Sequence, residues 1–166
     1  ELSEGAPVMM SPRCRAQQEI SGELFRQIAN YLEGKKCRVY AAPFAVRLFE
    51  KPNDDASSVD TVVEPDLSVV CDRDKLDAKG CKGAPDLVIE ILSPSSVRND
   101  RLTKFNLYQR AGVREYWIVN PSEKSVQVFI LEGGHYTATA LGSESDVLKV
   151  NVLDGCYIDL SRVFNE

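Results

Sequence analysis

The chain has 166 residues, of which 43% are hydrophobic and 27% charged, with a formal net charge of −5 and a single histidine. This size suits one domain, 1–166, around one core. No apolar run approaches the roughly 18 residues of a membrane span. Glu1 and Glu4 stand where a signal peptide would carry basic residues, so we expect a cytoplasmic protein without a membrane partner. The opening resembles folded sequence, so we expect it to begin inside a longer natural chain.

Histidine and cysteine usage narrows the chemistry. One histidine makes Ser-His-Asp and multi-histidine metal chemistry unlikely candidates, so a bound metal should be a hard cation held by oxygen atoms. The cysteine number is odd and CxxC pairs are absent, which argues against a disulfide framework and a zinc site. We therefore expect reduced thiols that act as small hydrophobic side chains. The cysteines are Cys14, Cys37, Cys71, Cys81 and Cys156.

The first third of the chain predicts a short strand, a long helix and a second strand. Residues 8–10 resemble a strand that ends at Ser11 and Pro12. Residues 17–33 have helical periodicity, and Gly34 fits the end of that helix. The apolar positions of the helix are Ile20, Leu24, Ile28, Tyr31 and Leu32. Residues 39–49 are strand-like with Pro43 at an edge or bulge, and a polar turn follows over 51–60.

The middle of the chain contains two similar segments, 61–72 and 83–94, in which Pro-Asp precedes a β-branched run. Residues 73–82 between them predict a charged loop. A second helix is predicted from a cap at Asn99 or Asp100 to about Arg110, with Gly112 ending it.

The last third predicts a strand over 114–120 and a β-hairpin of 125–131 with 135–141, which turns at Gly133-Gly134 and leaves His135 exposed. Residues 155–164 close the domain. The order of elements predicts an α/β fold in which helices pack on a mixed sheet.

Two acidic residues on neighbouring predicted strands suggest a metal site. Side chains alternate along a strand, so Asp86, Val88 and Glu90 share a face. A glutamate within this apolar run is costly to bury alone. If the two strands pair, Asp66 meets Glu90, and close carboxylates repel each other unless a cation lies between them. That pattern points to Mg²⁺ or Mn²⁺ held by Asp66 and Glu90.

Each acidic residue also has a purely structural interpretation. Asp66 and Asp86 both follow a proline and could cap a turn. Glu90 could face solvent from an edge strand. Glu19 and Glu23 lie one helical turn apart, and a solvated helix face competes with an accessory role at the metal.

The second helix is basic. Lys104 follows Glu90 across a loop and could fold back to it, or it could pair with Asp100 at i,i+4. An ammonium near the acids could orient water or stabilise charge on a phosphate. Leu102 and Phe105 should then face the core. The remaining basic residues of this region are Arg98, Arg101, Arg110 and Arg114.

Several segments resemble a known family. These are "ELSEGAPVMMSP", "VEPDLSVV", "APDLVIEILSPSS" and "RNDRLTKFNLYQRAGVREYWIVNP". In this order they are similar to a large bacterial family of restriction-endonuclease-like proteins, formerly a domain of unknown function. That family is similar to the superfamily named for its PD-(D/E)XK motif. The resemblance implies a restriction-endonuclease-like mixed sheet flanked by helices, with an added C-terminal β-hairpin.

The resemblance also implies site residues. The motif aspartate falls on Asp66 and the motif acid on Glu90, while Leu92 stands where the superfamily has lysine. Lys104 matches a known variation in which the following helix supplies the lysine. Asp86 resembles a second family aspartate of unassigned role. Gln17 or Gln18 stands where family members tend to carry a histidine.

These residues together predict a Mg²⁺-dependent DNA endonuclease. Asp66 and Glu90 would hold the metal and Lys104 would assist the water nucleophile or the transition state. Arg98, Arg101 and Arg110 would contact DNA phosphates, and a homodimer would suit cleavage of both strands. The rivals are a non-catalytic binding or assembly module, favoured by the acidic net charge and by Leu92, and a small-molecule hydrolase that uses the same carboxylates.

Overall fold

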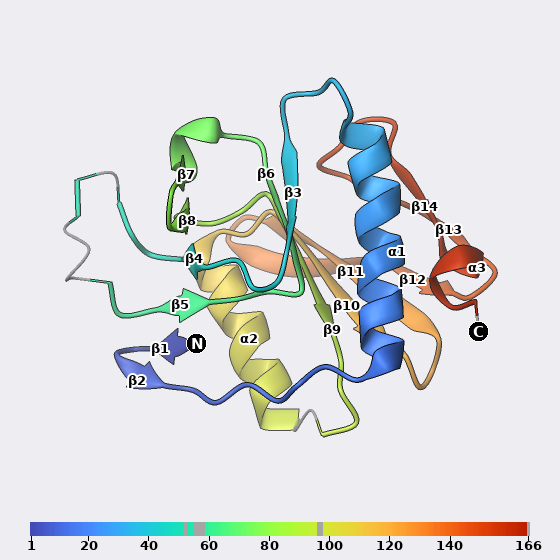
Figure 1. Ribbon diagram of the computed structural model, residues 1–166, viewed down its shortest axis with the longest axis horizontal. Coiled ribbons are helices and arrows are strands. Elements are labelled where there is room, and N and C mark those ends of the chain that lie inside the picture. Colours follow the sequence, from blue (N-terminus) through green and yellow to red (C-terminus); the bar gives the residue numbers. More distant parts are fainter. Residues whose placement is uncertain (52, 55–58, 96–97, 166) are drawn as a thin grey trace.

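The computed structural model describes residues 1–51, 53–54, 59–95 and 98–165, and its centre is a mixed sheet (Figure 1). Strands β9 and β10 run parallel to each other, and α2 (Arg98–Ala111) connects them. The other neighbours in this sheet are antiparallel. In spatial order the strands are β12 (His135–Ser143), β11 (Ser125–Glu132), β10 (Glu115–Asn120), β9 (Leu87–Ile91), β6 (Leu67–Val70) and β3 (Arg38–Ala41).

Helices α1 (Arg15–Leu32) and α2 lie on opposite sides of the central strands (Figure 1). Alternation along β9 explains this. Leu87 and Ile89 belong to the hydrophobic cluster that contains the buried face of α1. Val88 belongs to the cluster that contains the buried residues of α2. Even-numbered residues of β9, Glu90 included, therefore face the α2 side.

A second, smaller mixed sheet lies beside the first. Its order is β2 (Ala6–Pro7), β1 (Leu2–Ser3), β5 (Val62–Val63), β4 (Val46–Arg47), β8 (Gly80–Lys82) and β7 (Leu76–Asp77). The C-terminal part adds the antiparallel pair β13 (Val147–Lys149) and β14 (Tyr157–Asp159), followed by α3 (Leu160–Val163). Ile158 and Leu160 pack in the same cluster as α1.

The predicted α/β fold class is confirmed, and so are the helix ending near Gly34 and the hairpin turning at Gly133-Gly134. His135 is exposed, as expected. Within the described residues, no helix is long and apolar enough to span a bilayer.

Several local predictions were wrong. Residues 8–10 are not a strand, because the paired strand ends at Pro7 and Met9 is 97% exposed. The predicted strand over 39–49 is interrupted around a cis Ala42–Pro43 bond. Residues 73–82 form a short 3₁₀ turn, Arg73–Lys75, and the β7–β8 hairpin instead of a plain loop. The predicted turn over 51–60 lies partly outside the described residues.

The start of α2 also differs from its prediction. The helix begins at Arg98, so Asn99 and Asp100 lie inside it and do not precede it as a cap. Leu102 is 58% exposed and does not face the core, whereas Phe105 packs against the cluster on the α2 side. The helical spacing was right, but the face that it buries is rotated toward Phe105, Leu107 and Tyr108.

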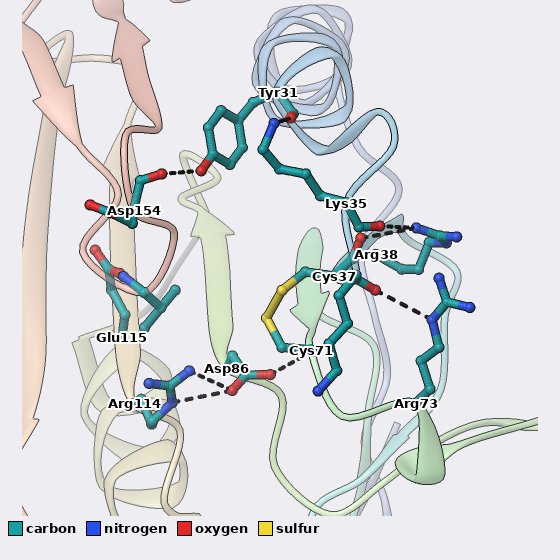
Figure 2. Close-up of a disulfide and its surroundings, with 12 residues drawn as sticks. Tyr31, Lys35, Cys37, Arg38, Cys71, Arg73, Asp86, Arg114, Glu115 and Asp154 are labelled. Carbon is teal, nitrogen blue, oxygen red and sulfur yellow. Dashed lines mark hydrogen bonds and ion pairs between the residues drawn. A yellow bond between two sulfur atoms is a disulfide. The ribbon is translucent and has the colours of Figure 1, made fainter.

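A disulfide joins Cys37 and Cys71, which corrects the expectation that every cysteine is a reduced thiol. The two residues lie next to the paired strands β3 and β6, whose register sets Arg38 opposite Val70. The extension of that register places the two cysteines directly across from each other (Figure 2). Strand pairing over 34 residues of sequence separation brings them together, and cysteine spacing does not reveal that.

We expect Cys37→Ser to lower the free energy of unfolding by about 2–4 kcal/mol in oxidising buffer, because the cross-link limits the unfolded chain over its 34-residue separation. Urea denaturation followed by circular dichroism measures this. Cys14→Ser is the control, since Cys14 is free and exposed. A Cys37→Ser protein as stable as the wild type in oxidising buffer would contradict the cross-link.

Candidate active site

The pairing of β6 with β9 brings Asp66 and Glu90 together. The two strands are antiparallel with Leu67 opposite Ile89, so the next pair outward is Asp66 and Glu90. Side chains of directly opposed residues lie on the same face of a sheet. Both carboxylates are almost completely buried, with Asp66 4% and Glu90 5% exposed.

Asp66 is held by a main-chain donor and an arginine. Its carboxylate accepts a hydrogen bond of 2.7 Å from the Ile91 N–H, just beyond the end of the β6–β9 ladder. The Arg13 Nη2 lies 2.9 Å from it. Burial and the neighbouring Glu90 charge raise the pKa of Asp66 to about 6, although the Ile91 N–H, Arg13 and Lys104 act in the opposite direction. The raised pKa reflects two acids that share a site poor in water.

Glu90 is held by two residues from α2. Its Oε1 accepts a hydrogen bond of 2.6 Å from the Tyr108 hydroxyl and one of 3.2 Å from the Lys104 Nζ. Lys104 and Tyr108 lie one helical turn apart, so one face of α2 presents both donors to the sheet. These contacts fix one carboxylate oxygen of Glu90 and orient the other toward Arg13, whose Nη2 is 3.9 Å away.

Lys104 reaches the acid pair and stays charged there. Its ion pairs are with Glu90 at 3.2 Å and with Glu1 at 3.5 Å, so the alternative pairing with Asp100 is not the contact that the structure forms. Burial alone would lower the pKa of Lys104, but the charges of Glu90 and Glu1 outweigh burial and hold the pKa above its usual value. A partly buried lysine that remains protonated can donate to an anion.

Arg13 is a site residue that the sequence did not reveal. It lies between β2 and α1, and its guanidinium contacts Asp66, Glu90 and, through Nη1 at 3.2 Å, the carbonyl oxygen of Ile91. A positively charged residue in a segment without periodicity gives no sequence signal beyond its charge.

Gln17, in the first turn of α1, also reaches the site. Its Oε1 accepts a hydrogen bond from the Cys14 N–H at 3.0 Å, and its Nε2 lies 3.4 Å from the Ile91 carbonyl oxygen. Gln18 is exposed. Of the two glutamines considered from the sequence, Gln17 is therefore the one near the acids.

The carboxylates open into two separate hollows. One of about 230 Å³ is lined by Glu90, Lys104 and Arg101. The other, of about 380 Å³, is lined by Asp66 and Gln17. Arg13 lines both. Asp66, one residue before β6, and Glu90, on the neighbouring β9, thus lie opposite each other as expected, but they line two hollows that share Arg13, where one common cleft was expected.

The accessory acids lie elsewhere. Asp86 immediately precedes β9, at the end of the strand opposite to Glu90. Its carboxylate accepts hydrogen bonds from the Cys71 N–H at 2.7 Å and from Arg114 (Figure 2). It holds the disulfide end of the sheet. Glu19 pairs with Arg15, and Glu23 with Arg26, both within α1.

The basic residues of α2 are spread along its length. Arg101 lines the Glu90 hollow. Arg98 is exposed at the first residue of the helix. Arg110 is 3.6 Å from Glu4 and lies over the Phe49 ring. Nine residues of helix rise about 13 Å, so Arg110 lies well away from the Arg101 side of the hollow.

The donors at the site are chemically suited to a hard cation. Asp66, Glu90 and the Ile91 carbonyl supply oxygen atoms, which Mg²⁺ and Mn²⁺ prefer. In the described part of the chain, no group of three or more His, Cys, Asp or Glu side chains could hold a metal. Two carboxylates and a carbonyl are donors of the type that Mg²⁺ uses together with water, whereas zinc prefers nitrogen and sulfur ligands.

The fold resembles that of a solved protein described as "a putative nuclease belonging to DUF820", from Anabaena variabilis. The TM-score is 0.74, the sequence identity is 18%, and the match covers 97% of this chain and 87% of that one. At this identity the likeness defines a nuclease-like fold.

The chain belongs to the Uma2 family, described as "Putative restriction endonuclease", which it matches over residues 1–161. It is also 27% identical over 131 residues to "Uncharacterized protein slr1290" from Synechocystis sp.. That match covers 78% of this chain and 64% of the relative, so the chain spans somewhat less than two thirds of that relative's length.

Proposed function

We propose that this protein is a divalent-metal-dependent endonuclease that hydrolyses phosphodiester bonds of DNA. The observation that carries the proposal is the pair of buried carboxylates, Asp66 and Glu90, with the Lys104 ammonium hydrogen-bonded to one of them. Buried ionisable groups that perturb one another, such as these acids, occur most often at functional sites. Membership of the Uma2 family and the nuclease-like fold support the same interpretation.

The residues have distinct roles in this proposal. Asp66, Glu90 and the Ile91 carbonyl would hold Mg²⁺ or Mn²⁺, which would supply Lewis-acid catalysis for phosphodiester hydrolysis. Lys104 keeps its proton and donates to the charge that grows on phosphate oxygens during attack. The Tyr108 hydroxyl fixes the orientation of Glu90.

The exposed basic residues of α2 would bind the DNA backbone. Arg101 is at the Glu90 hollow and is the best placed for a phosphate near the reacting bond. Arg98 and Arg110 would contact phosphates farther along, without reading base sequence. We propose a homodimer on DNA, since two copies of the chain would cut the two strands. We also propose a cytoplasmic location.

A second candidate function is a non-catalytic DNA-binding or assembly module of the same fold. The specific observation that favours it is that Arg13 and Lys104 already balance the charges of Asp66 and Glu90. Leu92, where the superfamily motif has lysine, points the same way.

Cleavage of supercoiled plasmid separates the two functions. We expect the purified protein to nick or linearise the plasmid with Mg²⁺ or Mn²⁺ and to be inactive in EDTA. A DNA duplex with phosphorothioate linkages should be cut more slowly with Mg²⁺ than with Mn²⁺, since sulfur binds Mg²⁺ poorly. DNA binding without cleavage in either metal would favour the non-catalytic module.

A further inference from the structure

Arg13 contacts the same oxygen atoms that the proposed metal site offers to a cation. Its Nη2 lies 2.9 Å from Asp66 and 3.9 Å from Glu90, and its Nη1 donates to the Ile91 carbonyl at 3.2 Å. One planar guanidinium thus spans both carboxylates and the carbonyl. A fork of several N–H donors is the side-chain geometry that can do this.

A metal and this guanidinium compete for the same site. Both are positive, and both need the Asp66 carboxylate and the Oε2 of Glu90, since the Oε1 of Glu90 already accepts from Tyr108 and Lys104. Like charges in a poorly hydrated site repel each other strongly. The contacts of Arg13 and a bound ion are therefore alternatives.

The surroundings of Arg13 allow it to leave. Its side chain is 25% exposed, unlike the acids that it joins. It lies in a stretch outside helix and strand, between β2 and α1. Arg13 lines both the Glu90 hollow and the Asp66 hollow, together with Met10 and Ser11, so its guanidinium has open space into which it can move.

We propose that Arg13 is the resident counter-ion of the Asp66–Glu90 pair and that a divalent cation binds only by displacing its guanidinium. Arg13 then keeps the two buried acids neutralised and in position before the metal arrives, at the cost of weaker metal affinity. This inference rests on the proposed function, because it names the group that the divalent cation of the proposed nuclease must displace.

The test is Mn²⁺ titration calorimetry of the folded protein at pH 8, with folding checked by circular dichroism. We expect Arg13→Met to bind Mn²⁺ about tenfold more tightly than the wild type, since removal of a competing charge should lower the dissociation constant by about a factor of ten. Arg13→Lys keeps the charge without the fork and should fall between them. Arg15→Met is the matched control, because Arg15 is 91% exposed and pairs with Glu19; it should bind Mn²⁺ like the wild type.

A second readout covers a variant that folds poorly. By linkage, Mn²⁺ should raise the melting temperature of Arg13→Met more than that of the wild type. Equal or weaker Mn²⁺ binding by Arg13→Met, beside clear binding by the wild type, would overturn the competition and leave the metal site intact. Absence of binding in every variant would overturn both this inference and the proposed metal site.

Discussion

Lys104→Met should lower the single-turnover rate of DNA cleavage by about a hundredfold or more while it leaves DNA affinity in Ca²⁺ nearly unchanged. Removal of one donor to developing charge in a site poor in water costs factors of this size. Lys104 is the group whose removal should matter most, because it is partly buried, hydrogen-bonded to Glu90 and held protonated by its acidic neighbours. Methionine keeps an unbranched side chain that is one atom shorter and removes the charge and the donors.

The comparison with Arg101→Ala sharpens this prediction. Arg101 lines the same hollow, whereas the donors that bind Glu90 from α2 are Lys104 and Tyr108. If Arg101 only binds phosphate, its loss should weaken DNA binding and reduce the steepness of the salt dependence by about one unit. Arg110→Ala should behave likewise. Cleavage by Lys104→Met at the wild-type rate would reduce Lys104 to a structural partner of Glu90.

Glu115→Ala should destabilise the fold by about 3–5 kcal/mol. Glu115 is completely buried, and its carboxylate accepts hydrogen bonds from the Trp117 indole, from the main chain and side chain of Asn151, and from the Val152 N–H. Alanine would leave the buried Trp117 N–H without an acceptor and would remove the shared acceptor of Asn151 and Val152, and a buried unpaired donor costs about 1–3 kcal/mol. The network ties β10 to the turn after β13.

Urea denaturation followed by Trp117 fluorescence measures this loss, since the chain has a single tryptophan. Glu115→Gln should lose less, because one carbonyl oxygen still accepts. Glu132→Ala is the control, because Glu132 is exposed on β11. If Glu115→Ala and Glu132→Ala unfold at the same urea concentration, the network contributes no net stability.

Patterns with a regular period were the part of the fold that could be predicted. Ile20, Leu24 and Ile28 recur at helical spacing and are all buried in α1. The alternation along β9 correctly separated Leu87 and Ile89 from Glu90. In both cases the sequence encodes which face is buried, and burial is what organises these elements.

Features that depend on distant partners could not be predicted. Cys37 meets Cys71 only because β3 pairs with β6. Arg13 reaches Asp66 from an irregular segment, so no periodicity marks it. Leu102 shows the limit of helical spacing, since the spacing gives a repeat but not the direction of its buried face. Asp86 and Glu90 point to the same face of the sheet, yet Asp86 accepts a hydrogen bond from the disulfide residue Cys71, whereas Glu90 lies beside Asp66 and accepts one from Tyr108.

The central claim is that Asp66 and Glu90 form a metal-dependent catalytic site. The contrast between Glu90 and Asp86 provides its most direct test. The measurement is single-turnover cleavage of a labelled DNA duplex with Mn²⁺, together with Mn²⁺ calorimetry, for Glu90→Gln and for Asp86→Asn. Both changes remove one negative charge from the same strand. The account predicts that Glu90→Gln loses cleavage and Mn²⁺ binding while Asp86→Asn retains both. Cleavage and Mn²⁺ binding by folded Glu90→Gln at wild-type levels would contradict it.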